Sequence, residues 1–207
     1  MKANFYVDAF NLYYGSLKGT PYRWLDLQAL FAKVFPRNEI NRIRYFTAIV
    51  ESRPSDLRRP AHQDAYLRAL RTIPNLSIHL GQYKTRAVQL PLATPPRTGP
   101  KTARVLRTEE KGSDVNLASY LLLDAFRGDC ETAIVVSNDA DLKAPIEIAK
   151  DELGISVGVL NPHPPNHRSL DLQPTFFKQL RRGPIAASQF PRALTDSRGK
   201  IRKPSSW

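Results

Sequence analysis

Carboxylates follow two apolar runs of the sequence at the points where those runs end. Asp8 ends the run Asn4-Phe-Tyr-Val, and Asp139 and Asp141 come directly after Thr132-Ala-Ile-Val-Val-Ser-Asn. Both runs are typical of buried parallel strands, and the carboxyl ends of such strands are where open α/β sheets bind their ligands. A few converging aspartates suit Mg²⁺ or Mn²⁺, which prefer hard oxygen ligands. The pattern therefore predicts metal-assisted chemistry on a phosphodiester.

Asp114 adds a fourth carboxylate at the start of a predicted helix. Gly112-Ser113 provides an N-cap, and apolar residues then recur at helical spacing up to Phe126. Asp114 is therefore expected in the first turn, near the positive end of the helix dipole, where it could close the cluster from the side. We expect Asp8, Asp114 and Asp139 to ligate the ion.

Each of these polar residues also has a purely structural interpretation. Asp141 could cap the helix that follows it, and Asp114 could serve only the helix dipole. Asp8 is harder to explain in that way, because an ionised carboxylate in its apolar context needs a partner or a metal. Asn11 and Ser137 could be turn residues, or they could orient the metal ligands through hydrogen bonds. In the catalytic interpretation, Asp141 assists as a ligand or as a base that orients water.

Composition limits the partners of such a site. The chain of 207 residues carries 31 Lys plus Arg against 19 Asp plus Glu, a formal net charge of +12. That charge would attract a polyanion such as RNA, although ribosomal contacts or an acidic membrane could use it equally well. The single cysteine excludes an intrachain disulfide, and no apolar stretch approaches the length of a membrane span. We expect a cytoplasmic protein without a membrane segment.

Short β-rich runs alternate with stretches of helical period, which predicts an α/β fold with a parallel sheet. The predicted strands are Asn4 to Ala9, Ile43 to Val50, Leu76 to Tyr83, Ala133 to Ser137 and Ser156 to Leu160. The predicted helices are Asp26 to Phe35, Ala61 to Arg71, Asp114 to Phe126 and Leu142 to Glu152. One domain over residues 1–182 accommodates these elements.

Two segments interrupt the alternation. Residues 84–108 are basic, rich in proline and without acids, which predicts an extended, loop-like insertion that could lie along a nucleic-acid backbone. A solvated excursion with a β-hairpin at its ends (Val88 to Leu92 and Ala103 to Leu106) fits the composition equally well. The candidate nucleic-acid-binding residues are Lys84, Arg86, Arg97, Lys101, Arg104 and Lys111. Residues 183–207 are polar and basic, which predicts a flexible tail.

Three ordered motifs resemble a known family. The segments VDAFNLYYG (7–15), KGSDVNLASYLLLDAF (111–126) and VVSNDADL (135–142) are similar to those of NYN-domain proteins, a branch of the PIN-like nuclease superfamily. The continuation of the first segment into GSLKGTPYRWLDL resembles the LabA-like bacterial subgroup of that family. The resemblance covers roughly residues 3–181.

The resemblance implies a Rossmann-like three-layer α/β/α sandwich and an acidic, Mg²⁺- or Mn²⁺-dependent pocket that hydrolyses RNA. Asp8 matches the acid of the first strand, Asp114 the acid of the KGxD motif, and Asp139 with Asp141 the later pair. Asn11 and Ser137 match polar residues of the same motifs, for which the resemblance implies a supporting role. The resemblance also implies a homodimer.

One position departs from the family pattern and keeps other functions open. Tyr120 stands where many relatives carry a further Asp in the KGxD helix, and Asp124 one turn later does not obviously replace it. An RNA-binding protein with weak or no catalysis is therefore an alternative to the endoribonuclease. A phosphatase with Asp8 as nucleophile is a third hypothesis, disfavoured because Phe10 stands where a second Asp would be expected.

Overall fold

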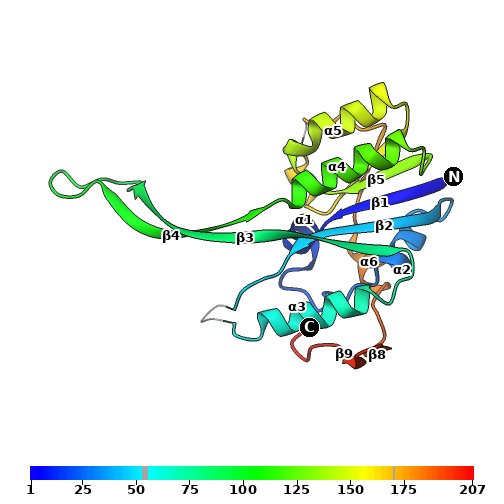
Figure 1. Cartoon of the computed structure of the whole chain (residues 1–207), viewed down its shortest axis with the longest axis horizontal. Coiled ribbons are helices and arrows are strands. Elements are labelled where there is room, and N and C mark those ends of the chain that lie inside the picture. Colours follow the sequence, from blue (N-terminus) through cyan, green and yellow to red (C-terminus); the bar gives the residue numbers. More distant parts are fainter. Residues whose placement is uncertain (53–55, 170) are drawn as a thin grey trace.

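The strands form a seven-stranded sheet in the order β4-β3-β2-β1-β5-β6-β7 (Figure 1). This computed structural model describes residues 1–52, 56–169 and 171–207. Neighbouring strands run parallel, except that β3 and β4 are antiparallel. The mainly parallel α/β sheet predicted from the sequence is therefore confirmed.

All the predicted strands are present, with shifted ends. The sheet consists of β1 (Lys2–Asp8), β2 (Glu39–Ala48), β3 (Leu76–Pro91), β4 (Thr102–Lys111), β5 (Thr132–Val136), β6 (Ser156–Asn161) and β7 (Phe176–Gln179). The four-residue edge strand β7 was not predicted, because its Phe-Phe-Lys-Gln sequence is too short to show a period.

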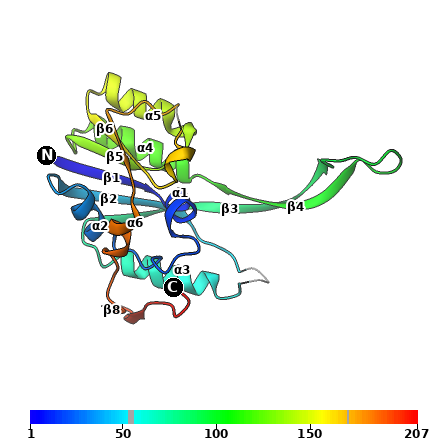
Figure 2. The same cartoon turned by 180° about the vertical axis from the view of Figure 1, so that it is seen from behind.

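Helices cover both faces of the sheet (Figures 1 and 2). They are α1 (Ala9–Leu12), α2 (Leu27–Val34), α3 (Arg59–Leu70), α4 (Ser113–Phe126), α5 (Lys143–Glu147) and α6 (Arg182–Ala186), with single-turn elements η1 (Tyr13–Leu17), η2 (Ala140–Leu142), η3 (Ile148–Glu152) and η4 (Pro165–His167). α4 and α5 lie on one face, and α2, α3 and α6 lie on the other. No helix in the described ranges is long and apolar enough to cross a membrane.

Alternate residues of β1 supply both cores, as expected of a strand buried on two faces. Phe5 and Val7 pack in the cluster under α2 and α3, while Tyr6 packs in the cluster under α4 and α5. The ring of Phe5 stacks on Phe31 of α2 with centroids 4.1 Å apart. The central strand is thereby fixed from both sides, and its last residue, Asp8, is held at the edge of the sheet.

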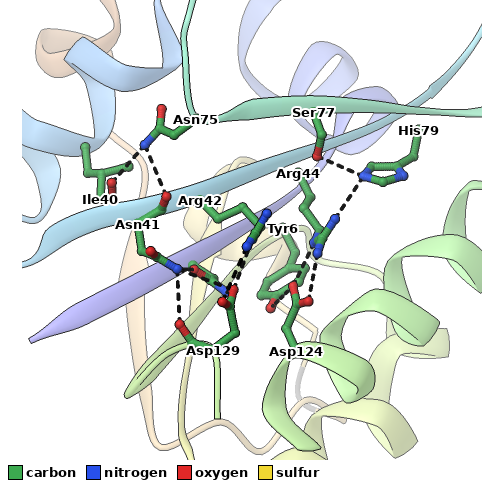
Figure 3. A network of polar contacts seen from close by, with 11 residues as sticks. Tyr6, Ile40, Asn41, Arg42, Arg44, Asn75, Ser77, His79, Asp124 and Asp129 are labelled. Atoms are coloured by element: carbon green, nitrogen blue, oxygen red, sulfur yellow. Dashed lines mark hydrogen bonds and ion pairs between the residues drawn. The ribbon is translucent and has the colours of Figure 1, made fainter. Parts of the chain in front are cut away.

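A buried ion pair fastens α4 to the sheet (Figure 3). Asp124 accepts hydrogen bonds from Nε and Nη2 of Arg44, each at 2.7 Å, and from the Tyr6 hydroxyl at 2.9 Å. Both partners of the pair are almost fully buried. The guanidinium of Arg44 also lies 4.3 Å from the ring centroid of Tyr120, which is 4.1 Å from the ring of His79. The position of α4 on β1 and β2 therefore depends on directed polar contacts as well as on apolar packing.

The insertion is a β-ribbon, so the hairpin alternative (Val88 to Leu92 and Ala103 to Leu106) is confirmed and the loop-like alternative is wrong. β3 and β4 pair without interruption from Gln82↔Lys111 to Pro91↔Thr102 and extend beyond the body of the protein as an arm, residues 82–111 (Figures 1 and 2). Pro91 ends β3, and the other prolines of the segment lie in the turn between the strands. Cross-strand pairs such as Val88↔Val105 and Thr85↔Thr108 favour the ribbon. The pairing extends further along both strands than the predicted hairpin.

The segment predicted to be a flexible tail is folded, so that prediction is wrong. After α6, β8 (Ala193–Asp196) and β9 (Gly199–Arg202) form a hairpin, and Phe190 and Ile201 are buried in the core. Trp207 packs with Trp24, their ring centroids 6.2 Å apart. A few well-spaced apolar side chains suffice to bury the segment, although its composition is polar and basic.

Removal of Asp124 should leave the buried guanidinium of Arg44 without a negatively charged partner. We expect Asp124→Ala to lower the free energy of unfolding by about 3 kcal/mol, since breaking a buried pair is strongly destabilising. Urea unfolding measures this change. The control is Asp64→Ala, which removes the carboxylate of the exposed Arg198–Asp64 pair and should cost less than about 1 kcal/mol. Equal losses of unfolding free energy in the two variants would show that burial does not determine how much the Arg44–Asp124 pair contributes to stability.

Candidate active site at the carboxyl ends of the strands

Asp8 is a buried carboxylate at the carboxyl end of β1, with 4% of its surface exposed. One oxygen accepts the backbone N–H groups of Phe10 and Asn11, both at 3.0 Å, and thereby caps α1. The other accepts the Ser137 hydroxyl at 3.0 Å. Burial raises the pKa of Asp8 and the charge of Asp139 raises it further, while the three hydrogen bonds oppose that rise. Asp8 is therefore held in place at an electrostatic cost.

The turn after β5 lies against the end of β1, because the two strands are parallel neighbours. The backbone N–H of Asn138 donates to the Asn11 side chain at 3.0 Å. The N–H of Asp139 donates to the Ser137 hydroxyl at 3.2 Å, and one oxygen of Asp139 accepts the N–H of Asp141 at 3.0 Å. The side chains of Asn11 and Ser137 thus connect the ends of the two strands.

Asp114 faces these carboxylates from the first turn of α4. The helix starts after Gly112, whose φ of 101° is a left-handed conformation that favours glycine. Burial, followed by the charges of Asp8, Asp139, Glu110 and Asp141, raises the pKa of Asp114 to about 6. The other four carboxylates are therefore close enough to Asp114 to disfavour its charge, and we call the five residues the acidic group: Asp8, Glu110, Asp114, Asp139 and Asp141.

Glu110 is the member that the sequence analysis missed. Its side chain accepts hydrogen bonds from the N–H of Ser113 at 3.2 Å and from the Ser113 hydroxyl at 2.8 Å. Gly81 lets this carboxylate approach, since a Cβ there would lie 2.2 Å from an oxygen of Glu110. A signal was present in the sequence, because Glu109 and Glu110 interrupt a long basic stretch just before the KGSD motif.

The carboxylates of the acidic group are suitable ligands for a divalent cation, but they do not form a complete coordination site by themselves. In the part of the chain that the structure describes, no three His, Cys, Asp or Glu side chains are grouped so that they could hold a metal ion. The uncompensated negative charge around Asp114 nevertheless favours a cation. Mg²⁺ commonly uses only one or two carboxylates, with waters and substrate oxygens as its other ligands. The donor set fits an ion held in that open manner.

Tyr120 and Asp124 lie away from the acidic group. Tyr120 packs on Arg44 and His79, and Asp124 binds Arg44 and Tyr6. Asp124 is ten residues after Asp114, which corresponds to about 15 Å along an α-helix. Asp124 therefore does not replace the acid that Tyr120 displaces from the family pattern.

The candidate nucleic-acid-binding residues all lie exposed on the arm or its turn: Lys84, Arg86, Arg97, Lys101, Arg104 and Lys111. Alternate cross-strand pairs share a face of a ribbon. The pairs Lys84↔Glu109, Arg86↔Arg107 and Gln82↔Lys111 consequently place four cations around one carboxylate. Glu109 contacts Arg107 at 2.6 Å, Lys111 at 3.3 Å and Arg86 at 3.8 Å. This basic face begins three residues before Asp114.

A pocket lies beside the residues that follow Asp8. It is lined by residues of α1 and η1, Arg23, the end of β2, Asp56 with α3, and Trp207. Its aromatic side chains are Phe10, Tyr13, Tyr14, Tyr45, Tyr66 and Trp207, and we call it the aromatic pocket. Ala9 and Phe10 directly follow Asp8, so the pocket adjoins the acidic group along the chain.

Comparison with known proteins identifies the family to which this architecture belongs. A family model described as the NYN domain matches residues 2–177. The chain belongs to the NYN-domain family. This domain is of the nuclease type, which supports hydrolase chemistry at a general level, and the resemblance noted in the sequence is confirmed.

Two individual proteins resemble this NYN-domain chain over most of its length. The 6-hydroxy-3-succinoylpyridine 3-monooxygenase HspA of Pseudomonas putida (strain DSM 28022 / S16) is 32% identical over 236 aligned residues, which cover 100% of this chain and 75% of that protein. A protein of unknown function from Vibrio parahaemolyticus RIMD 2210633 has a crystal structure with a TM-score of 0.56 and 18% identity, covering 91% of this chain and 96% of that one. The second likeness shows the fold alone.

The raised pKa of Asp114 predicts a pH-dependent cost to stability. The folded state holds the Asp114 proton up to about pH 6, whereas the ordinary value is 3.8. Between these values the folded state binds more protons than the unfolded state, so this group destabilises the fold as pH rises through that window. We expect Asp114→Asn to raise the melting temperature in EDTA at pH 7.5 and to have little effect at pH 3.5.

Thermal unfolding of both proteins across this pH range measures the difference. Asp151→Asn, at an exposed carboxylate on η3, is the control and should show no such trend. An Asp114→Asn protein that is less stable than the wild type at pH 7.5 would contradict the repulsion.

Proposed function

We propose that this NYN-domain protein is a metal-dependent endoribonuclease. One observation carries the proposal: Asp8 at the end of the buried strand β1 and Asp139 after the buried strand β5 lie close enough to Asp114 at the start of α4 to raise its pKa, in a chain whose net charge is +12. An acidic site on a basic protein suits a cation that neutralises phosphate while the surrounding surface attracts the polyanion.

Asp8, Asp114 and Asp139 would hold Mg²⁺ or Mn²⁺. Such an ion lowers the pKa of a bound water and stabilises negative charge that develops on the phosphate. Asp141, exposed at the rim, would orient the attacking water or complete the ligand set. Asn11 and Ser137 would keep the ends of β1 and β5 in register through the hydrogen bonds already described.

The basic face of the arm would hold the RNA that enters this site. Lys84, Arg86 and Lys111 are exposed there, and Arg97, Lys101 and Arg104 extend the charge towards the turn. Contacts of this kind bind phosphates without reading sequence, and their strength falls steeply with added salt. Cytoplasmic location and homodimer formation stay predictions from the sequence.

Neutralising one central carboxylate should remove cleavage while leaving the fold intact. We expect Asp139→Asn to slow RNA cleavage at least about 100-fold, since single groups that stabilise charge in a transition state typically contribute 10²–10³. Gel analysis of end-labelled RNA with Mn²⁺ measures the rate, with Asp151→Asn as the matched control.

Unchanged cleavage by Asp139→Asn would remove this residue from the site. Tight RNA binding without cleavage by the wild type would instead favour the RNA-binding alternative, in which the fold persists and catalysis is lost.

A second candidate function is the oxygenation of a small aromatic acid. It is favoured by HspA, whose name gives it a pyridine substrate, and by the aromatic pocket beside Asp8. Such a reaction transfers one atom of O₂ to the ring and reduces the other to water with a two-electron donor. We expect no NADH- and O₂-dependent hydroxylation of 6-hydroxy-3-succinoylpyridine if the nuclease assignment is right. If the wild type and Asp139→Asn both hydroxylate this substrate, the oxygenase function would replace the nuclease assignment.

A further inference from the structure

The aromatic pocket has a composition that the proposed cleavage does not require. Among the described residues, its sides come from several separate parts of the chain, namely α1 with η1, Arg23, the end of β2, Asp56 with α3, and Trp207. Trp207 reaches it because β8 and β9 fold the last residues back beside α3 (Figure 1). The folded terminal segment therefore completes a cavity that the rest of the chain would leave open.

Ring edges and faces surround this cavity. Tyr66 lies with its ring centroid 6.3 Å from Tyr45 and 5.9 Å from Trp207, in edge-to-face geometry. Tyr13 and Tyr14 approach each other in the same geometry at 5.2 Å. The hydroxyl of Tyr66 is already bonded to the Leu25 carbonyl. An aromatic guest can stack or pack edge-on against such rings without displacing existing hydrogen bonds.

Two arginine side chains, Arg23 and Arg59, line the pocket together with the aromatic rings. Arg23 lies 5.3 Å from the ring of Trp207 and donates through Nη2 to the Ser206 carbonyl. Its Nε is buried and has no hydrogen-bond partner in the described part of the chain. Arg59, at the start of α3, also lines the pocket, as does the exposed carboxylate of Asp56. The buried donor of Arg23 needs an acceptor, which an anionic guest would supply.

The volume of the pocket limits the ring it accepts. The cavity measures about 130 Å³, close to the roughly 150 Å³ of an apolar cavity that binds benzene. One six-membered ring fits such a space, whereas the fused rings of a purine would extend out of the pocket.

We propose that the aromatic pocket binds a single six-membered aromatic ring that carries an anionic group, with the ring among Tyr13, Tyr45 and Tyr66 and the anion at Arg23 and Arg59. Two sources share this chemistry: a pyrimidine nucleotide, in a free form or within RNA, and a free aromatic carboxylate. The nucleotide form rests on the proposed nuclease function, and the carboxylate form does not.

The position of the pocket connects it to the acidic group. Tyr45 pairs with Val7 across β1 and β2, one residue before Asp8. Ala9 and Phe10 line the pocket immediately after Asp8. A pyrimidine held there would bring the neighbouring phosphodiester towards the carboxyl end of β1, so the pocket would select the nucleotide beside the bond that is cut.

Calorimetric titration in EDTA tests the pocket separately from cleavage, which requires metal in the proposed function. The probes are uridine 5′-monophosphate, adenosine 5′-monophosphate and 4-hydroxybenzoate. We expect the uridine nucleotide or 4-hydroxybenzoate to bind at least tenfold more tightly than the adenosine nucleotide. Preference for the uridine nucleotide identifies RNA as the source, and preference for 4-hydroxybenzoate identifies a free aromatic acid.

Arg59→Met removes a pocket cation, and we expect it to weaken that binding about tenfold, as loss of one charge-assisted contact does. Arg58→Met is the matched control, because this exposed neighbour carries the same charge outside the pocket and should change the affinity less than twofold. Tyr13→Leu tests the ring contact independently and should also weaken binding. Thermal unfolding verifies that each variant is folded.

Three results would overturn the proposal: no binding of any probe at millimolar concentration, equal affinity for all three probes, or equal losses in Arg58→Met and Arg59→Met. Because none of these titrations involves cleavage, a failure of the nuclease assignment would appear only in the cleavage assay and would leave the carboxylate form of the proposal intact.

Discussion

The buried contact between Arg44 and Asp124 fixes the relation between α4 and the sheet, and the candidate site depends on that relation. Arg44 belongs to β2, whose neighbour β1 carries Asp8 at its end, while Asp124 belongs to the helix that carries Asp114 at its start. A rotation of α4 by one residue would remove Asp124 from its hydrogen bonds with Arg44 and Tyr6 and Asp114 from the acidic group together. The hydrogen bonds fix the register of the helix, and apolar packing alone would specify it less sharply.

The fold thereby concentrates negative charge in a protein that is otherwise strongly basic. Hydrogen bonds from Phe10, Asn11 and Ser137 hold Asp8 in place, although burial and the charge of Asp139 oppose its ionisation. Repulsion of this kind is typical of functional sites, where stability is sacrificed for chemistry. A bound cation would relieve it, and the electropositive arm that starts beside Asp114 would attract a polyanion towards the same place.

Local sequence signals were sufficient for the central strands β1, β2, β5 and β6 and for the placement of Asp8, Asp114 and Asp139 at strand and helix ends. The apolar runs before Asp8 and Asp139 identify strands whose ends must be neighbours, and glycine with a following acid identifies the start of α4. Features that depend on contacts between residues far apart in the chain could not be predicted from the sequence. Glu110 joins the group only because Gly81, on another strand, admits its carboxylate. The terminal segment folds because Phe190 and Ile201 are buried in a core built from the rest of the chain. The arm contains the hairpin that the sequence offered as one alternative, but the pairing of β3 and β4 extends well beyond it.

The most direct measurement is cleavage of a panel of single-stranded and structured RNAs by the wild-type protein with Mn²⁺, with Mg²⁺ and with EDTA. Our account predicts fragments with at least one of the two ions and none with EDTA, because the carboxylates alone repel phosphate and the ion supplies the charge that they lack. Cleavage of equal rate in EDTA would contradict a metal-dependent site, and intact RNA under all three conditions would contradict the nuclease itself.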